Sequence, residues 1–502
     1  MRTQMQNSNN TANRARGRAS ARRSMRDGMI IPILFAALLA LTGCTLAPDY
    51  QRPDAPIPNT YPLQGTAPGN GNGQAERGAE GDISAAPPAW REFFQDEIMR
   101  EVIALALENN RDLRVSMLNI ERTRAQYRIQ RADLLPTVAA AGSSSNQRLP
   151  AGVSQTGVET VSRQYSASLG FSAFELDLFG RIRSLTEQAL QEYYSVEEEA
   201  KSAQLSLVAE TAAMYLQLVA DRELYDLTRA TLVSWEENYE LIRRKYEAGV
   251  ASDLDLSQAE SILNEARVNL ASMATQVGQD ENALALLMGC PLPESLPEVR
   301  RLADVAPLRD IPEGLPSELL ERRPDIRAAE HQLMGSNANI GAARANFFPT
   351  ISLTGSLGKL SSEYNSLWDG ASRTWSFMPQ VSLPIFDMGR NMAQLEVSET
   401  DKQIAVARYE KTIQSAFREV ADTLVARQHI GDRLESQKAL VASTQRSYRH
   451  ASTRYNAGVS SYLNVLDAQR SLYSAQSSMI STRLLRESNA LMLYKTLGGG
   501  WE

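Results

Sequence analysis

The chain has 502 residues, a formal net charge of −7, 43% hydrophobic residues and two cysteines. Residues 1–28 contain seven Arg and one Asp, so the rest of the chain carries a net charge of about −13. This acidic balance argues against a nucleic-acid partner. No run of 18 or more apolar residues follows residue 44, which excludes a later transmembrane helix. A membrane-crossing domain would therefore have to be a β-barrel.

The first predicted element is an export signal over residues 1–43. An arginine-rich segment precedes the apolar run 29–41, and Leu41-Thr42-Gly43-Cys44 follows. This order describes an exported protein, and Met1 and Met25 both fit as its start. The ending resembles a bacterial lipoprotein signal, in which Cys44 becomes the lipidated first residue of the mature chain. The resemblance favours sorting of that lipoprotein to the outer membrane. An ordinary signal peptide is the alternative. With Cys44 lipidated, Cys290 has no partner for an internal disulfide.

The rest of the chain is a tether followed by two copies of one plan. Residues 44–95 are rich in Pro, Gly and Asn and predict an extended tether. Residues 112–136 match residues 325–349 at an offset of 213, and later motifs match at an offset of 209. Repeat 1 is predicted over 96–290 and repeat 2 over 317–498, with a proline-rich connector over 291–316 and a short end over 499–502. Each repeat predicts a helix, a β-hairpin and a long helical hairpin.

The helical hairpins carry a coiled-coil pattern. No proline occurs from Arg181 to Cys290 or from Ile385 to the end, and a continuous helix from residue 181 to 246 would be roughly 100 Å long. Small and apolar residues alternate in steps of three and four, which is a heptad pattern. They are Leu256, Ala259, Leu263, Ala266, Leu270, Met273 and Val277 in repeat 1, and Val465, Ala468, Leu472, Ala475 and Met479 in repeat 2. We expect long antiparallel coiled-coil helices.

The β-hairpins, at about 137–178 and 350–384, alternate apolar with small or polar residues. Such alternation is typical of membrane β-strands, although a half-buried soluble hairpin is the alternative. The export signal and the matched placement favour the membrane. Four strands cannot close a barrel, so strands must be shared between chains: two chains would give eight and three would give twelve. The helical hairpins would then close around the same axis into a tube.

Several motifs along the mature chain resemble the outer-membrane efflux factor family, and most closely the OprM-type lipoproteins within the wider TolC family. They are YQRP (50–53), WREFF (90–94), NNRDL (109–113), ELDLFGR (175–181), RRPD (322–325), FFP (347–349) and LDAQRSL (466–472). The resemblance implies a mainly α fold with a small membrane β part. It implies a homotrimer whose shared twelve-stranded β-barrel continues into an α-helical barrel.

The same resemblance implies a function. The protein would lie in the outer membrane of a Gram-negative bacterium, with a long periplasmic extension. It would be the passive exit channel of a tripartite pump for drugs or other small molecules, with a periplasmic adaptor and a proton-driven inner-membrane transporter of the RND type as partners. A duct for protein secretion and a coiled-coil envelope lipoprotein are the alternatives. No cofactor is expected apart from the lipid on Cys44.

The candidate site residues follow the two turns of the helical hairpins. Gly249 and Gly458 are expected to stop the helices with a positive φ and to form the turns where the adaptor docks. Leu463, Asp467 and Arg470 are spaced i, i+4, i+7 and share one face of the next helix. Such a face is usually only solvated, but a leucine there is unexpected. By resemblance, Leu463 and Asp467 match the family's periplasmic constriction residues, with Arg470 nearby. A ring of Asp there would select cations.

Asp255 follows the first turn and resembles a residue that tethers the closed tip to a neighbouring helix through Tyr455. Some members carry a basic residue two positions after the second glycine, where this chain has Ser460. That departure weakens the case for an ionic lock through Asp255.

An enzyme is not expected. His331, His429 and His450 lack metal-ligand spacing, and the chain has neither a nucleophile-elbow motif nor a Walker loop.

Overall fold

The computed structural model describes residues 45–58, 61, 88–154, 157–294, 296, 300–305, 308 and 323–499. The predicted signal peptide, the lipidation site Cys44 and most of the connector lie outside these residues. Among the residues it describes, none of the helices is both long enough and apolar enough to span a membrane.

The chain divides into two compact units that cut across both repeats. One unit comprises Met1–Arg52, Thr123–Tyr193 and His331–Val406, and the other comprises Pro53–Arg122, Tyr194–Glu330 and Ala407–Glu502. Each repeat therefore contributes to each unit, which fits two halves built on one plan.

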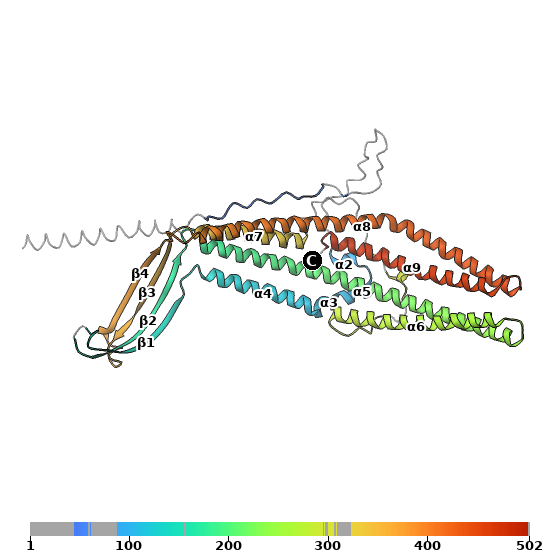
Figure 1. Ribbon diagram of the computed structural model, residues 1–502, viewed down its shortest axis with the longest axis horizontal. Coiled ribbons are helices and arrows are strands. Elements are labelled where there is room, and N and C mark those ends of the chain that lie inside the picture. The colour runs from blue at the N-terminus through green and yellow to red at the C-terminus, as the bar shows by residue number, and fades with distance from the viewer. Residues whose placement is uncertain are drawn as a thin grey trace, which may run out of the picture. The chain divides into compact units, whose positions relative to one another are not determined.

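The first unit contains a four-stranded antiparallel sheet in the order β1-β2-β3-β4 (Figure 1). The strands are β1 (Val138–Leu149), β2 (Thr160–Leu176), β3 (Thr350–Ser361) and β4 (Arg373–Ser382), with the short helix η3 (Gly370–Ser372) before β4. The hairpin of repeat 1 pairs with the hairpin of repeat 2 through β2 and β3. β1 and β4 are therefore the two edges of the sheet within one chain.

The two faces of the sheet differ in polarity. On one face Leu169 lies opposite Leu357, and Leu357 lies opposite Trp375. On the other face serine hydroxyls pair across the strands: Ser143 with Ser166 at 2.7 Å, and Ser356 with Ser376 at 2.8 Å. The alternation read from the sequence is present in the folded strands, because successive side chains of a strand point to opposite faces.

The helices are α2 (Trp90–Phe93), α3 (Glu97–Asn109), α4 (Arg111–Ala132), α5 (Arg181–Glu247), α6 (Asp253–Met288), η1 (Leu302–Asp304), α7 (Pro324–Ala345), α8 (Arg390–Asn456) and α9 (Tyr462–Thr496). Helices α5 and α8 have 67 residues each and begin 209 residues apart. In the second unit, α5 pairs with α6 and α8 with α9 as two antiparallel hairpins (Figure 1). The expected seam residues of α6 and α9 are buried or half-buried, so the coiled-coil prediction is confirmed.

At the end of the hairpins away from the turns, a polar side chain joins each repeat's last helix to the start of a shorter one. Asn110 Nδ2, just before α4, donates to the carbonyl of Leu287 at 2.8 Å. Arg323 Nη1, just before α7, donates to the carbonyl of Thr496 at 2.7 Å. Residues 287 and 496 are again 209 apart, so the two bonds satisfy carbonyls at equivalent helix ends that have no partner within their own helix.

Candidate functional site

The two hairpin turns have the same backbone structure. Gly249 and Gly458 have φ of +73° and +72°. In each turn the glycine N–H donates to the carbonyl three residues back and the following valine N–H to the carbonyl five back, at 2.8–3.0 Å. This is a Schellman motif, which needs the left-handed conformation that glycine adopts without strain. A Cβ at either glycine would meet no other atom within 4 Å, so the backbone alone requires glycine there.

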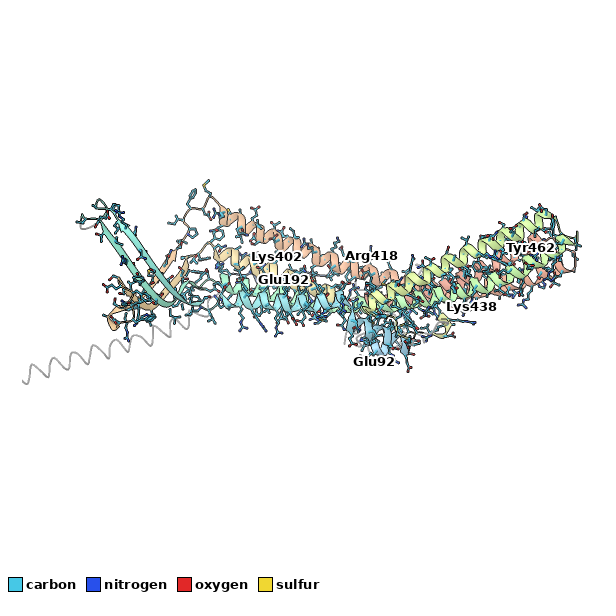
Figure 2. The ribbon with its side chains drawn as sticks, turned by 90° about the horizontal axis from the view of Figure 1, so that it is seen from below. Glu92, Glu192, Lys402, Arg418, Lys438 and Tyr462 are labelled. Carbon is cyan, nitrogen blue, oxygen red and sulfur yellow. The ribbon has the colours of Figure 1, made fainter. Side chains whose placement is uncertain are left out.

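A buried cluster next to the turns holds the two hairpins together. We call this set the tip cluster: Trp235, Ile242, Ala259, Ile262, Ala266, Tyr462, Val465 and Leu466. Its members come from α5, α6 and α9, and Tyr448, Ala451 and Tyr455 of α8 pack against it. Tyr462 lies near the turns at the end of the hairpins (Figure 2), and burial raises the pKa of its hydroxyl above the ordinary value. The tip is thus one packed unit of four helices.

The predicted constriction residues lie on the face of α9 that points away from this cluster. Leu463 is 49% exposed, whereas Val465 and Leu466 are buried. Asp467 and Arg470 are also exposed. The structure therefore brings Leu463, Asp467 and Arg470 together on one open face, where another chain or a pore can meet them.

Arg470 also connects the two hairpins. Its Nη2 donates to Glu265 Oε2 of α6 at 3.3 Å, and both side chains are more than half exposed. An exposed ion pair of this kind contributes about 0–1 kcal/mol to stability. The ion pair therefore mainly positions α9, because it links this helix to α6 of the same chain. Sequence reasoning missed Glu265, since nothing local indicates which helix faces Arg470.

A second leucine, Leu254, was also missed. The offset of 209 places it at the position of Leu463 in the other hairpin, and it is 66% exposed. Applying the repeat alignment to the candidate site would have found it. The residue four positions on differs, because Gln258 stands where the second hairpin has Asp467. At this position of the repeat, an acidic side chain follows the second turn and a neutral amide follows the first.

Asp255 is engaged within its own helix end. Its Oδ2 accepts from the backbone N–H of Ser252 at 3.1 Å and from the Ser252 hydroxyl at 2.7 Å, and its N–H donates to the Ser252 hydroxyl at 3.2 Å. This is a capping box at the start of α6. Tyr455 lies under Lys245, whose Nζ is 4.2 Å from the ring centroid. The tether of the closed tip from Asp255 to the neighbouring helix through Tyr455 stays a prediction.

An acidic pair between α5 and α6 was also missed. Gln276 donates to Asp280 Oδ1 at 2.9 Å, and Gln217 donates to Asp221 Oδ2 at 2.7 Å. Asp280 is 4% exposed. Burial first, and then the neighbouring Asp221 carboxylate, to which protonated Asp280 can donate a hydrogen bond, raise the pKa of Asp280 to about 6. The seam pattern could have found it, because Asp280 is the next three-residue step after Val277.

The histidines do not converge on a site. His331 Nδ1 lies 2.7 Å from Gln191 Oε1, and His429 and His450 are exposed on α8. Within the described ranges no group of three His, Cys, Asp or Glu side chains could hold a metal ion.

Comparison with known proteins gives consistent matches over nearly the whole chain. The sequence model described as "Outer membrane efflux protein" matches residues 102–290 and again residues 315–499, which confirms the internal repeat. The probable efflux pump outer membrane protein TtgC of Pseudomonas putida is 50% identical over 461 residues, covering 92% of this chain and 93% of that protein.

Two solved structures have the same fold. A membrane protein from Pseudomonas aeruginosa is 42% identical, with a TM-score of 0.82, over 91% of this chain and 98% of the other. The open state of the Neisseria gonorrhoeae MtrE outer membrane channel is 37% identical, with a TM-score of 0.80, over 91% of this chain and 99% of the other. These likenesses confirm the predicted fold class.

Proposed function

The chain belongs to the outer membrane efflux protein family, and we propose that it forms the exit channel of a tripartite pump that exports drugs or other small molecules. It lies in the outer membrane, and its helices extend into the periplasm. It acts as a passive duct rather than an enzyme, and an inner-membrane transporter supplies the energy. A lipid on Cys44 anchors its amino terminus.

The open sheet supports an oligomer that shares strands between chains, for which we propose three copies. In one chain β1 and β4 each have an unpaired edge, and an unpaired edge is too costly in hydrocarbon because its N–H and C=O groups find no partner. Pairing β1 of each copy with β4 of the next removes every edge. Three copies give twelve strands, well within the size range of outer-membrane barrels.

The observation that carries the proposed gate is the open face of α9 beside the buried tip cluster. Around a three-fold axis, Leu463 would form an apolar ring and Asp467 a ring of carboxylates. Rings of acidic side chains favour cations, and apolar constrictions can close a pore by excluding water. Arg470, held by Glu265 of its own chain, would fix the rotation of α9 and so keep both rings aimed at the axis.

Opening would follow docking of the periplasmic adaptor at the turns around Gly249 and Gly458. The turns are exposed, and a Cβ at either glycine would meet no other atom within 4 Å. An adaptor that grips them could move the tips apart while each Schellman turn stays intact. A contact between Asp255 and Tyr455 of adjacent copies would hold the tips closed until then. The inner-membrane partner is of the proton-driven RND type.

The test is the single-channel conductance of the purified protein in planar lipid bilayers. Wild type should conduct weakly and favour cations, whereas Leu463→Ala/Asp467→Ala should conduct several-fold more and discriminate less, because both rings are gone. The matched comparison is Leu254→Ala/Gln258→Ala at the equivalent positions after the first turn, which should raise the conductance less and leave the cation preference unchanged, because no carboxylate is lost there. Unchanged conductance in the α9 variant, or an equal rise in the comparison variant, would place the constriction elsewhere.

A further inference from the structure

The end of the sheet farthest from the helices carries two cations on its apolar face. Lys359 of β3 lies directly opposite Arg373 of β4. Each is two residues along its strand from Leu357 and Trp375, which also face each other. Because side chains alternate along a strand, all four lie on the same face. The apolar face thus ends in a row of positive charge.

A hollow of about 710 Å³ lies over this part of the sheet. Its lining includes the apolar side chains of Leu169, Leu357 and Trp368 together with Lys359 and Arg373. Leu169, Leu357 and Trp368 are all exposed. The hollow therefore offers an apolar floor with two cations at one end, which is the complement of an amphiphile with a negatively charged headgroup.

The two cations are available to such a headgroup. Lys359 Nζ donates to the carbonyl of Trp368 and lies 5.5 Å from the centroid of its ring, so the ammonium is held in place. Arg373 is exposed. In the part of the chain that the structure describes, neither cation forms an ion pair with a carboxylate, although Glu363 and Asp369 lie in the adjoining loop.

The hairpin of repeat 1 shows the contrast. At its outer end Arg148 Nη2 lies 2.7 Å from Glu159 Oε2, so the charge of this arginine is neutralised within the hairpin. The uncompensated pair of cations occurs in the second hairpin. Repetition of the fold therefore does not explain it.

The height of the pair on the sheet fits the outer boundary of the membrane. The helices join at the Thr350 end of β3, which makes that end periplasmic. Lys359 is nine residues farther along the strand. At about 3.3 Å per residue and a tilt of about 40°, nine residues rise roughly 23 Å, close to the apolar band of about 25 Å in such barrels. With Thr350 taken as the periplasmic edge of the apolar band, Lys359 and Arg373 reach the level of outer-leaflet headgroups.

We propose that this hollow binds a phosphorylated lipid of the outer leaflet. An acyl chain lies over Leu169 and Leu357, and a phosphate lies between the Lys359 ammonium and the Arg373 guanidinium. Arg can bind two phosphate oxygens in parallel, and Lys adds a compact charge. The site needs only that the sheet lies in the outer membrane, and it does not depend on what the channel exports.

The experiment is a lipid titration of the delipidated, full-length protein in non-ionic detergent, read by native mass spectrometry. The probes are lipid A carrying both phosphates and the same lipid after dephosphorylation. Wild type should bind the phosphorylated lipid at least tenfold more tightly than the dephosphorylated lipid. Lys359→Gln/Arg373→Gln should lose most of this preference, and Arg148→Gln/Glu159→Gln, which removes a compensated pair, should keep it.

Two further readouts separate the possible failures. The channel conductance of each variant, compared with wild type, reports folding and insertion independently of lipid binding. Competition with inorganic phosphate tests whether the acyl chain matters, and millimolar phosphate should displace little lipid. Equal affinity in the Lys359/Arg373 variant, no preference for the phosphorylated lipid, or full displacement by inorganic phosphate would overturn the proposal.

Discussion

The two repeats solve one structural problem with different chemistry. Repeat 1 uses the neutral Asn110 to satisfy the carbonyl of Leu287, and repeat 2 uses the charged Arg323 for the carbonyl of Thr496. Arg323 also bonds to Asp325 at 2.8 Å and to Glu419 at 3.0 Å, so it organises a small ionic network. The helix end sets the requirement, and the residue that meets it can vary.

In the middle of the helical hairpins, equivalent positions carry different side chains that also make different interactions. Asp221 and Asp280 meet between α5 and α6. At the equivalent positions, 209 residues later, stand Ile430 and Asn489. Asn489 Nδ2 donates to the carbonyl of Thr423 at 3.0 Å. At these positions of the described helices the first hairpin carries a buried titratable pair and the second does not, so the stability of the first should respond to pH.

The largest expected loss of stability comes from removing one of the two side chains that bond to the helix-end carbonyls, Arg323. Arg323→Ala leaves the buried carbonyl of Thr496 without its donor and removes the cation from two partly exposed carboxylates, and should cost about 3 kcal/mol of unfolding free energy. Asn110→Ala, the matched control, removes neutral hydrogen bonds and should cost about 1–2 kcal/mol. Denaturant unfolding of the full-length protein in detergent measures both. Equal losses would show that the ionic network around Arg323 adds nothing to stability.

The second effect isolates the acidic pair. Because the pKa of Asp280 is raised to about 6, the native chain binds more protons than the unfolded chain between about pH 4 and 6. Stability should therefore fall as pH rises through this window and stay level above it. Asp280→Asn, which copies Asn489, should be more stable than wild type at pH 7 and show no advantage at pH 4.

Thermal melts of wild type and Asp280→Asn across this pH range measure the effect. Asp422→Asn is the control, because Asp422 is an exposed carboxylate on α8. A wild-type melting temperature that rises with pH between 4 and 6, or an equal gain from Asp422→Asn, would contradict the assignment.

The smallest effect distinguishes the two tips. Ser252 closes a capping box with Asp255, whereas Ser461 at the start of α9 makes no side-chain cap. Ser252→Ala should cost about 1 kcal/mol, and Ser461→Ala should change stability by less than about 0.5 kcal/mol. Hydrogen exchange of the first-turn amides of α6 and α9 resolves the difference locally. Similar loss of protection in both helices would mean that the caps are equivalent.

Much of the fold was predictable because its signals are local. The three-four steps from Leu256 to Val277, the glycines at the turns and the strand alternation each depend on neighbours in sequence. The i, i+4, i+7 spacing likewise placed Leu463, Asp467 and Arg470 on one face. The Ser-x-x-Asp pattern at Ser252 is also that of a capping box, in which the Asp255 carboxylate bonds to Ser252 of the same chain.

Contacts between distant segments were not predictable. The bonds from Arg470 to Glu265 and from Arg323 to Thr496 join residues 205 and 173 positions apart. The heptad pattern predicts that helices pair, but it does not give the rotation that brings Asp280 against Asp221. Similarly, the strand pattern gave two hairpins, and the register that sets Lys359 beside Arg373 depends on the hairpin loop as well as on polarity.

The equal length of α5 and α8, 67 residues each, limits how the protein can evolve. One residue inserted into either helix would move its turn by about 1.5 Å and rotate it by about 100°. Gly249 and Gly458 would then no longer lie at matching positions in the two hairpins. A change in length that keeps the two turns matched has to be close to a whole number of helical turns and to occur in both halves. The internal repeat thus couples the helix lengths of the two halves.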